Sequence, residues 1–193
     1  MQEQEKQTAK GRDLYEWMQA LVCSVLVVVL LFTFVVRLIG VDGHSMVPTL
    51  QDGDRLLVLN ALWCGDYRPG DIVIVGQAFS DQETIVKRVV ATAGQTVDFD
   101  FETGSVYVDG AELDEPYIRE RTYTPEGVTF PLTVPEGCVF VLGDNRNDSK
   151  DSRHTELGAV DTRKILGKAV WLLIPGKTAE LDQRELSRIG SLN

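Results

Sequence analysis

A serine and a lysine are the side chains of this sequence best suited to nucleophilic chemistry. Ser45 opens the stretch SMVPTL (45–50), and Lys87 lies in an apolar segment further along the chain. A serine hydroxyl becomes nucleophilic when a neighbouring base takes its proton, and a neutral lysine amine can be that base. SMVPTL alone describes a turn equally well, because Ser and Thr hydroxyls commonly bond to backbone groups in turns. The case for chemistry therefore depends on what surrounds the serine.

Lys87 lies in a predicted strand, residues 84–91, that is rich in Val and Ile. Alternate residues of a strand share a face, so Lys87 points the same way as Ile85 and Val89. Burial among such side chains disfavours the ammonium form and lowers the lysine pKa, as a general base near neutral pH requires. Arg88 points the other way and stays protonated. Two alternatives stay open: Lys87 protects a sheet edge from aggregation, or its amine extends to solvent.

A third informative stretch is the polar loop, GDNRNDSKDSR (143–153), which follows a predicted apolar strand. A solvated loop held by its own side chains is one interpretation. A calcium loop is another, but the spacing does not match the EF-hand pattern. As support for a lysine base the loop makes sense, because a hydroxyl such as Ser149 can orient a neutral amine without charging it. The histidines are weaker candidates for the base, since His44 points away from Ser45 in extended chain and His154 lies in a polar loop.

A long apolar run precedes Ser45, with no charged residue in positions 17–36. Twenty helical residues span ~30 Å, the thickness of the bilayer hydrocarbon core. A cleavable signal peptide has a shorter apolar core and a small-residue cleavage site, and no Ala-x-Ala follows here. A buried soluble helix would need a polar face, which this run lacks. The sequence therefore predicts a permanent transmembrane helix at 17–38.

Basic residues predict the orientation of this helix. Lys6, Lys10 and Arg12 precede the run, whereas Arg37 and then Arg55 follow it. The positive-inside rule favours the side richer in Lys and Arg as cytoplasmic. We therefore expect a single-pass protein of the cell membrane with its N-terminus in the cytoplasm and its catalytic domain outside.

The rest of the chain reads as short strands separated by Gly and Pro turns, which indicates a mainly β, antiparallel sandwich or coiled barrel. The expected strands are 54–59, 72–75, 84–91, 96–101, 105–108, 139–142 and 165–174. The expected organisation is a cytoplasmic tail (1–16), the transmembrane helix (17–38), an extracytoplasmic β catalytic domain (39–176) and a C-terminal tail (177–193). Within the catalytic domain, residues 97–135 form a small inserted hairpin region. The C-terminal tail is expected to contain a short helix capped by Thr178.

Composition excludes some functions. A chain of 193 residues suits one modest domain plus an anchor, and its net charge of −10 argues against nucleic acid as a partner. Cys23 lies in the apolar run, which leaves Cys64 and Cys138, and whether these two form a disulfide stays open. No Cys or His spacing predicts a metal site.

Four stretches in order behind one anchor resemble the sequence boxes of bacterial type I signal peptidases, in their smaller Gram-positive-like type. They are SMVPTL (45–50), GDIV (70–73), VKRV (86–89) and GDNR (143–146) with Ser149, Asp151 and Arg153. VYVDG (106–110) with EPY (115–117) is also similar, and the resemblance covers roughly residues 15–174. It implies a membrane-bound serine protease with a Ser-Lys dyad that uses no metal or cofactor. We expect a monomer, although the sequence itself does not fix the oligomeric state. Its partners would be membrane lipid and exported preproteins, cut after small residues of the Ala-x-Ala type.

Carried over by position, the resemblance implies roles for individual residues. Ser45 resembles the nucleophile, Lys87 the general base and Ser149 the residue that orients the lysine. Supporting positions are matched by Arg88, Asp144, Arg146, Asp151 and Arg153, and we expect ion pairs there, such as Asp144 with Arg88.

One position departs from part of the family. Some members carry a serine two residues before the nucleophile that donates to the oxyanion, and here that position is Gly43. The oxyanion would then depend on the Ser45 backbone N–H and on water. Two other functions are weighed against the peptidase: a self-cleaving repressor-type protein, which the membrane span opposes, and a catalytically silent membrane-anchored scaffold. A scaffold has no need of Ser45, Lys87 and Ser149 together.

Overall fold

The computed structural model describes residues 2–80, 83–177 and 184–192, with side chains from residue 15 onward. The chain divides into two units, Met1–Arg37 and Leu38–Asn193. Each unit is described by itself below.

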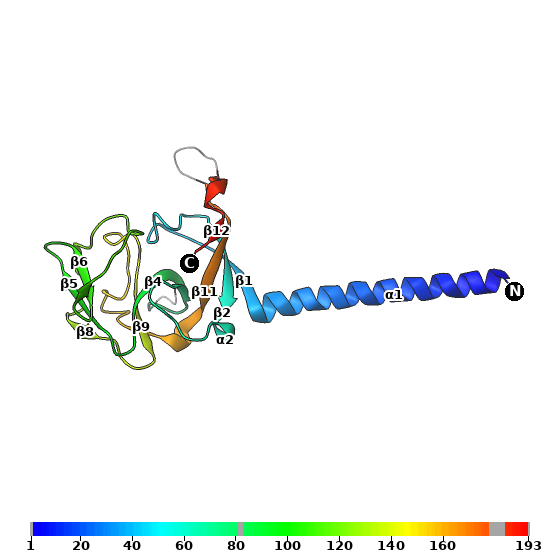
Figure 1. Ribbon diagram of the computed structural model, residues 1–193, viewed down its shortest axis with the longest axis horizontal. Helices are drawn as coiled ribbons and strands as arrows, with labels where there is room; N and C mark the ends of the chain where they lie inside the picture. Colours follow the sequence, from blue (N-terminus) through cyan, green and yellow to red (C-terminus); the bar gives the residue numbers. More distant parts are fainter. Residues whose placement is uncertain (1, 81–82, 178–183, 193) are drawn as a thin grey trace. The chain divides into compact units, whose positions relative to one another are not determined.

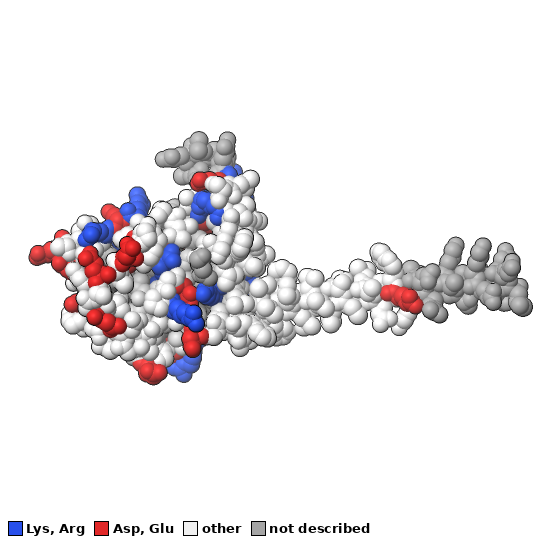
Figure 2. Space-filling model, in the orientation of Figure 1, with Lys and Arg blue, Asp and Glu red and all other residues white. Residues whose placement is uncertain are grey.

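The first unit is a helix, α1 (Gln2–Leu30), that continues as a π-helical turn, η1 (Leu31–Val35). This segment is rich in leucine, a good helix former, and it contains no Pro or Gly between Gly11 and Val35. Both features favour a long helix. In the described part of the chain, Tyr15–Val35 is the one helical segment long and apolar enough to cross a membrane. In Figure 2 the described part of this helix is white, apart from acidic atoms next to the grey residues. No charged residue therefore interrupts the apolar segment.

The second unit is built on an eight-stranded sheet in the order β1-β2-β11-β3-β4-β9-β10, with β12 beside β11. The pairings from β2 to β10 are antiparallel. The strands are β1 (Val36–Gly40), β2 (Arg55–Asn60), β3 (Ile72–Val75), β4 (Ile85–Thr92), β9 (Cys138–Leu142), β10 (Val160–Asp161), β11 (Ile165–Ile174) and β12 (Gly190–Ser191). Register shifts in β11 and between β4 and β9 interrupt the ladder, and such bulges bend strands, which is why this sheet curls.

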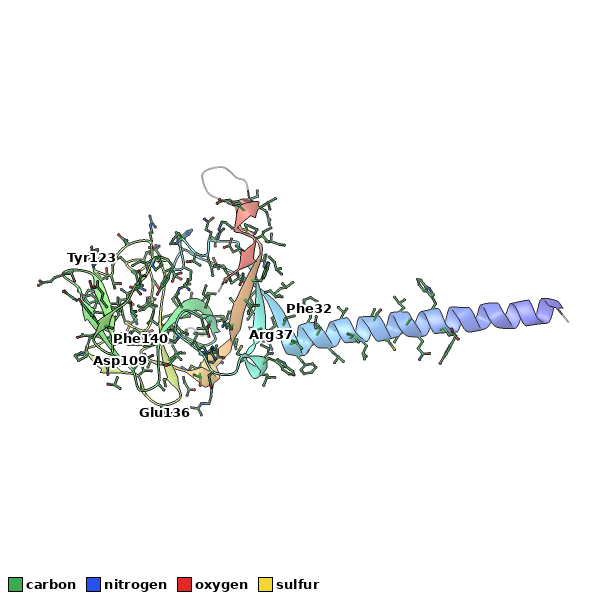
Figure 3. All side chains as sticks on the ribbon, viewed as in Figure 1. Phe32, Arg37, Asp109, Tyr123, Glu136 and Phe140 are labelled. Atoms are coloured by element: carbon green, nitrogen blue, oxygen red, sulfur yellow. The ribbon has the colours of Figure 1, made fainter. Side chains whose placement is uncertain are left out.

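A smaller sheet has the order β7-β6-β5-β8 and lies beyond β9 as seen from β2 (Figure 1). Its strands are β5 (Thr96–Asp100), β6 (Ser105–Val108), β7 (Ala111–Glu112) and β8 (Leu132–Thr133). Apolar side chains of both sheets form one buried cluster around Phe140 of β9, which Figure 3 labels. The Phe140 ring lies 5.9 Å from that of Phe130 and 6.2 Å from that of Phe99. Three short helical turns complete the unit: α2 (Ala61–Cys64), η2 (Thr162–Lys164) and η3 (Leu186–Arg188).

The expected strands all form, with ends that differ from the prediction by at most one residue, and the mainly β fold with one N-terminal apolar helix is confirmed. The helix expected after residue 177 is wrong for residues 184–192, which hold a 3-10 turn and a strand. Its expected cap, Thr178, lies outside the described residues. The tail is extended because its last residues pair with β11 instead of with one another.

Candidate active site

The structure brings Ser45 and Lys87 into direct contact. Lys87 Nζ donates a hydrogen bond to Ser45 Oγ over 2.7 Å and a second to the Val86 carbonyl over 3.0 Å. Both side chains line a cavity of about 800 Å³ formed by residues 39–46, 83–87 and 147–150 with Phe79 and Glu126. A hydroxyl and an amine within hydrogen-bond reach at a cavity wall are the geometry that nucleophile–base catalysis requires.

The sheet register explains why Lys87 is buried. Lys87 pairs with Val73 of β3, and the next residue, Arg88, pairs with Leu142, the last residue of β9. Because β9 ends there, the chain leaves the sheet as the polar loop, and residues 147–150 of this loop line the same cavity as Lys87. Only 3 % of Lys87 is exposed, as expected for a lysine on the same face as Ile85 and Val89.

Burial lowers the pKa of Lys87 from 10.5 to about 8. Desolvation of the ammonium is the largest cause, and the nearby carboxylates of Asp151, Glu83, Glu126 and Asp144 oppose it by raising the pKa. About half of the amines are therefore neutral near pH 8, and a neutral amine has the lone pair that a base needs.

Ser45 lies in the Ser45 loop, residues 41–54, which connects β1 to β2. The loop is closed at its base, where Val41 N–H donates to Asp54 O over 2.8 Å and Gly53 N–H donates to Val41 O over 2.9 Å. Met46 and Leu50 stand one helical turn apart and are both buried in the core, which turns Ser45 towards the cavity.

The polar loop holds the backbone on either side of the nucleophile. Asn145 N–H donates to the Ser45 carbonyl over 3.0 Å, and Asn145 Nδ2 donates to the His44 carbonyl over 3.1 Å. These two bonds fix the Ser45 backbone against the strand end that also covers Lys87.

The expected ion pair between Arg88 and Asp144 is present and buried. Arg88 donates to both carboxylate oxygens of Asp144, over 2.9 and 2.7 Å. Asp144 also accepts from the Thr49 hydroxyl over 2.5 Å, which ties the Ser45 loop to the polar loop. The Arg88 guanidinium lies over the Tyr117 ring, 4.1 Å from its centroid.

Arg146, Asp151 and Arg153 hold the polar loop in shape, and none of them forms a hydrogen bond with the Ser45 or Lys87 side chain. Arg146 pairs with Glu115 and donates to the Gly143 carbonyl over 3.0 Å. Arg153 donates to both oxygens of Asp151, one of which also accepts from Gly143 N–H over 3.0 Å. Buried charges need such partners, and here each pair also satisfies backbone groups of the loop.

Ser149 lines the cavity, but its expected hydrogen bond to Lys87 is not formed. Its buried Oγ has no hydrogen-bond partner among the described residues. Lys87 Nζ instead donates to Ser45 and to the backbone of Val86. Ser149 lies packed against Gly143, and its role in orienting the lysine stays a prediction.

Backbone groups beside Ser45 bear on the oxyanion. Gly43 has a positive φ of 93°, and its N–H donates to Asp52 over 2.9 Å, so that N–H is already in use. The Ser45 N–H makes no hydrogen bond to any residue that the structure describes. It is therefore available to a negative oxygen that forms next to Oγ.

Neither histidine takes the place of the lysine. The side chain that hydrogen-bonds to Ser45 Oγ is Lys87, and the His154 ring packs edge-on against Phe79 with 5.9 Å between the ring centroids. Cys23, Cys64 and Cys138 are free thiols, so Cys64 and Cys138 form no disulfide in this structure. No cluster of three or more His, Cys, Asp or Glu in the described ranges could hold a metal ion.

Some residues around the site were missed from the sequence. Glu126 lines the cavity and acts on the lysine charge, but it lies in a segment without a pattern of its own. Glu115 could have been found from the sequence. It belongs to the EPY stretch that resembles the family, and a buried Arg146 needs a carboxylate partner. Thr49 lies in SMVPTL and Asn145 in GDNR, but their contacts with Asp144 and with the Ser45 carbonyl become visible only in the folded chain.

Comparisons with known proteins agree on one family. The profile described as "Signal peptidase, peptidase S26" matches residues 14–174. The chain is 36 % identical to signal peptidase I of Bacillus licheniformis over 182 residues, which cover 89 % of this chain and 95 % of the relative. It is 36 % identical to signal peptidase I T of Bacillus subtilis over 180 residues, covering 89 % and 91 %.

A crystal structure of a signal peptidase I from Enterococcus faecalis also matches, with 30 % identity and a TM-score of 0.45, covering 54 % of this chain and 97 % of that one. The family profile spans most of the chain, and the curated relatives are matched over nearly their whole length. The chain therefore belongs to the signal peptidase family, peptidase S26, and is a serine endopeptidase.

Proposed function

We propose that this protein removes N-terminal signal peptides from exported preproteins through a Ser45–Lys87 dyad. The observation that carries the proposal is the 2.7 Å contact between Ser45 Oγ and a buried lysine amine at the wall of a cavity. The lowered pKa of Lys87, about 8, supports a role as base near neutral pH. The names of the relatives supply the substrate class.

The proposed reaction is acyl transfer. Neutral Lys87 takes the Ser45 proton while Oγ attacks the scissile carbonyl carbon, and the carbonyl oxygen becomes an oxyanion beside the Ser45 N–H. The resulting ammonium of Lys87 gives its proton to the leaving amine as the C–N bond breaks. The same lysine then activates the water that hydrolyses the acyl-enzyme, which frees Ser45.

The strand ends suggest how a substrate binds. Ile85 and Val86 pair with β3 on one side, and β9 has ended before it reaches them on the other. An extended peptide can add a strand at this open edge, with its carbonyl near Ser45. Small residues before the cut, of the Ala-x-Ala type, follow from the family resemblance.

Membrane anchoring by the apolar helix completes the proposal. Tyr15–Val35 is long enough to span a bilayer, with the N-terminus in the cytoplasm and the β domain outside. Nine steps of extended chain from Val36 to Ser45 reach at most ~30 Å, so the nucleophile stays close to the membrane surface. The cleavage site of a signal peptide emerges at that same level, beyond its own membrane-embedded core.

The test is cleavage of a preprotein carrying an Ala-x-Ala site by the full chain in detergent. Wild type, Ser45→Ala and Lys87→Ala are compared, and mass spectrometry locates the cut. We expect wild type alone to cut, directly after the second Ala.

Two results would count against parts of the proposal. A folded wild type that is inert on several preproteins would favour the silent scaffold and make Gly43 the first suspect. Normal cleavage by Lys87→Ala would keep the reaction but remove Lys87 as its base.

A further inference from the structure

The tail, residues 184–192, folds back onto the part of the domain that carries Ser45. β12 extends the sheet beside β11, with Trp171 opposite Ser191 and Leu172 opposite Gly190 (Figure 1). Leu192 packs against the core cluster that contains Met46 and Leu50. The tail therefore packs on the core cluster that also contains the two side chains that anchor the Ser45 loop.

Arg188 of the tail forms the closest polar contacts with that loop. Its guanidinium donates to both oxygens of Asp54, over 2.6 and 3.1 Å, and to the Thr49 carbonyl over 3.2 Å. Asp54 is fully buried, and its oxygens also accept from Gln51 N–H over 2.8 Å and from Gly176 N–H over 2.7 Å. The planar fork of an arginine can hold a carboxylate and a carbonyl at once, which an ammonium cannot do in the same geometry.

Thr49 connects this contact to the reacting groups. Arg188 holds its backbone carbonyl, while its hydroxyl donates to Asp144, the partner of Arg88 beside Lys87. Ser45 stands four residues earlier in the same turn, and Asn145 holds its carbonyl. The turn is thus fixed at one end by the polar loop and at the other by the tail.

We infer that Arg188 is a positioning residue for Ser45. It holds the Ser45 loop so that Oγ stays within reach of Lys87, and it does not line the cavity itself. The inference rests on the proposed function insofar as Ser45 is the nucleophile. Arg188 lies beyond residue 174, where the match to the family profile ends.

Substitution of Arg188 should change turnover more than substrate binding. Arg188→Met removes the hydrogen bonds to Asp54 and to the Thr49 carbonyl. The contact between Ser45 and Lys87 is then populated less, and kcat should fall by about tenfold. KM should change little, since no group of the cavity wall is removed. Arg188→Lys keeps the charge beside Asp54 and so a near-normal Tm, but it loses the fork and should still lower kcat.

The experiment measures kcat and KM on an Ala-x-Ala preprotein with the full chain in detergent, well below the Tm of each variant. Hydrogen exchange of residues 46–54 is followed in the same samples. Arg184→Met is the matched control, because it removes the same charge from the tail while Arg184 contacts the Pro175 carbonyl and not the Ser45 loop. We expect faster exchange in the loop and lower kcat for Arg188→Met, and neither change for Arg184→Met.

A kcat for Arg188→Met within about twofold of wild type, with unchanged exchange, would overturn the inference. If that variant does not fold, Asp54→Asn combined with Arg188→Met removes the unpaired buried charge and is measured in its place. A low kcat in the folded double variant supports positioning, whereas a normal kcat shows that Arg188 only neutralises Asp54. An inert wild type would refute the proposed function. Hydrogen exchange does not depend on peptidase activity, so it would still test whether Arg188 holds the Ser45 loop.

Discussion

Two opposing effects set the protonation of Lys87. Burial in the cavity wall lowers its pKa, and the carboxylates of Asp151, Glu83, Glu126 and Asp144 raise it. Burial is the larger effect, so the pKa is about 8 and not the 10.5 of an exposed lysine. The amine is neutral often enough to act as a base near neutral pH and basic enough to take the hydroxyl proton.

The first prediction concerns the pH dependence of cleavage. Below pH 8 most Lys87 is protonated and has no lone pair, so kcat/KM should fall by about tenfold per pH unit on the acid side and level off above the pKa. The measurement is the rate of peptide cleavage between pH 6 and pH 10. Lys87→Arg should abolish the activity at every pH, because a guanidinium stays charged, and an unchanged profile in this variant would refute the assignment.

The second prediction uses Glu126 to move that profile. Its carboxylate raises the pKa of Lys87, so Glu126→Gln should lower this pKa and shift the acid limb of the profile to lower pH. In wild type the Asp151 N–H donates to the Glu126 carboxylate over 3.4 Å. Glutamine keeps an oxygen that can accept this bond, so the loop geometry should be retained. Glu136→Gln makes the same change at an exposed position of the domain, labelled in Figure 3, and should leave the profile in place. A shift to higher pH in Glu126→Gln would contradict the argument.

At the scale of elements, the end of β9 assembles the site. Gly143 follows the strand directly, and its backbone passes between Ser149 and the Ser45 carbonyl. A Cβ at Gly143 would lie 2.1 Å from Ser149 Oγ and 2.5 Å from the Ser45 carbonyl oxygen, closer than atoms can approach. Only glycine lets the polar loop and the Ser45 loop approach this closely.

The third prediction tests this close approach. Gly143→Ala should force the two loops apart, lower the stability by about 1–3 kcal/mol and reduce kcat more than a hundredfold, since the nucleophile itself moves. Thermal unfolding and peptide cleavage measure the two effects. Gly190→Ala is the matched control, because no atom lies within 4 Å of a Cβ there, and it should behave as wild type. Normal activity in a folded Gly143→Ala would show that the loops adjust freely.

The strands were predictable because their signals are local. The Val and Ile run between Gly70 and Gly76 gave β3 (Ile72–Val75) its observed ends, and the largely apolar stretch that ends before Pro175 gave β11 (Ile165–Ile174) its ends. The tail was not predictable in this way. Its structure follows from pairing with β11 and from Arg188 reaching Asp54, and neither contact leaves a periodic signal in the sequence.

At the scale of the molecule, the apolar helix and the β domain are separate compact units. The β domain buries its own core, and every described side chain that lines the cavity comes from residue 39 onward. The chemistry and the proposed anchoring are therefore divided between two parts of the chain.

The fourth prediction follows from this division. A fragment that begins at Val36, and so keeps β1 (Val36–Gly40), should fold and cleave a short soluble peptide with a kcat/KM within about threefold of the full chain, since the cavity is complete. On a preprotein embedded in lipid vesicles it should lose far more activity, because the substrate is no longer concentrated beside the enzyme at the membrane. Equal losses on both substrates would show that the helix supports the domain itself. Ser45→Ala in the fragment is the control for contaminating proteases.

The reacting groups of the site could be predicted from the sequence, but the residues that position them could be predicted only in part. Ser45 and Lys87 were predicted together because each lies in a stretch that resembles a family box and a lysine in an apolar strand can be a base, and the fold places them 2.7 Å apart. The role of Ser149 was predicted from its hydroxyl in the polar loop and from the resemblance, but its Oγ has no hydrogen-bond partner among the described residues, and Lys87 donates to Ser45 and Val86. Glu126 and Arg188 act across long sequence separations, which only the folded chain can bring together.

The hold of Arg188 on the Ser45 loop has a consequence for biosynthesis. Thr49 and Arg188 are 139 residues apart in the sequence, so a ribosome completes the nucleophile's loop long before it makes the residue that fixes the loop. A nascent chain consequently carries Ser45 and an apolar segment resembling those it is proposed to cut, while its own cutting geometry is still incomplete. The proposed hold of Arg188 therefore leaves the Ser45 loop without this support until the C-terminal residues of the chain have been made.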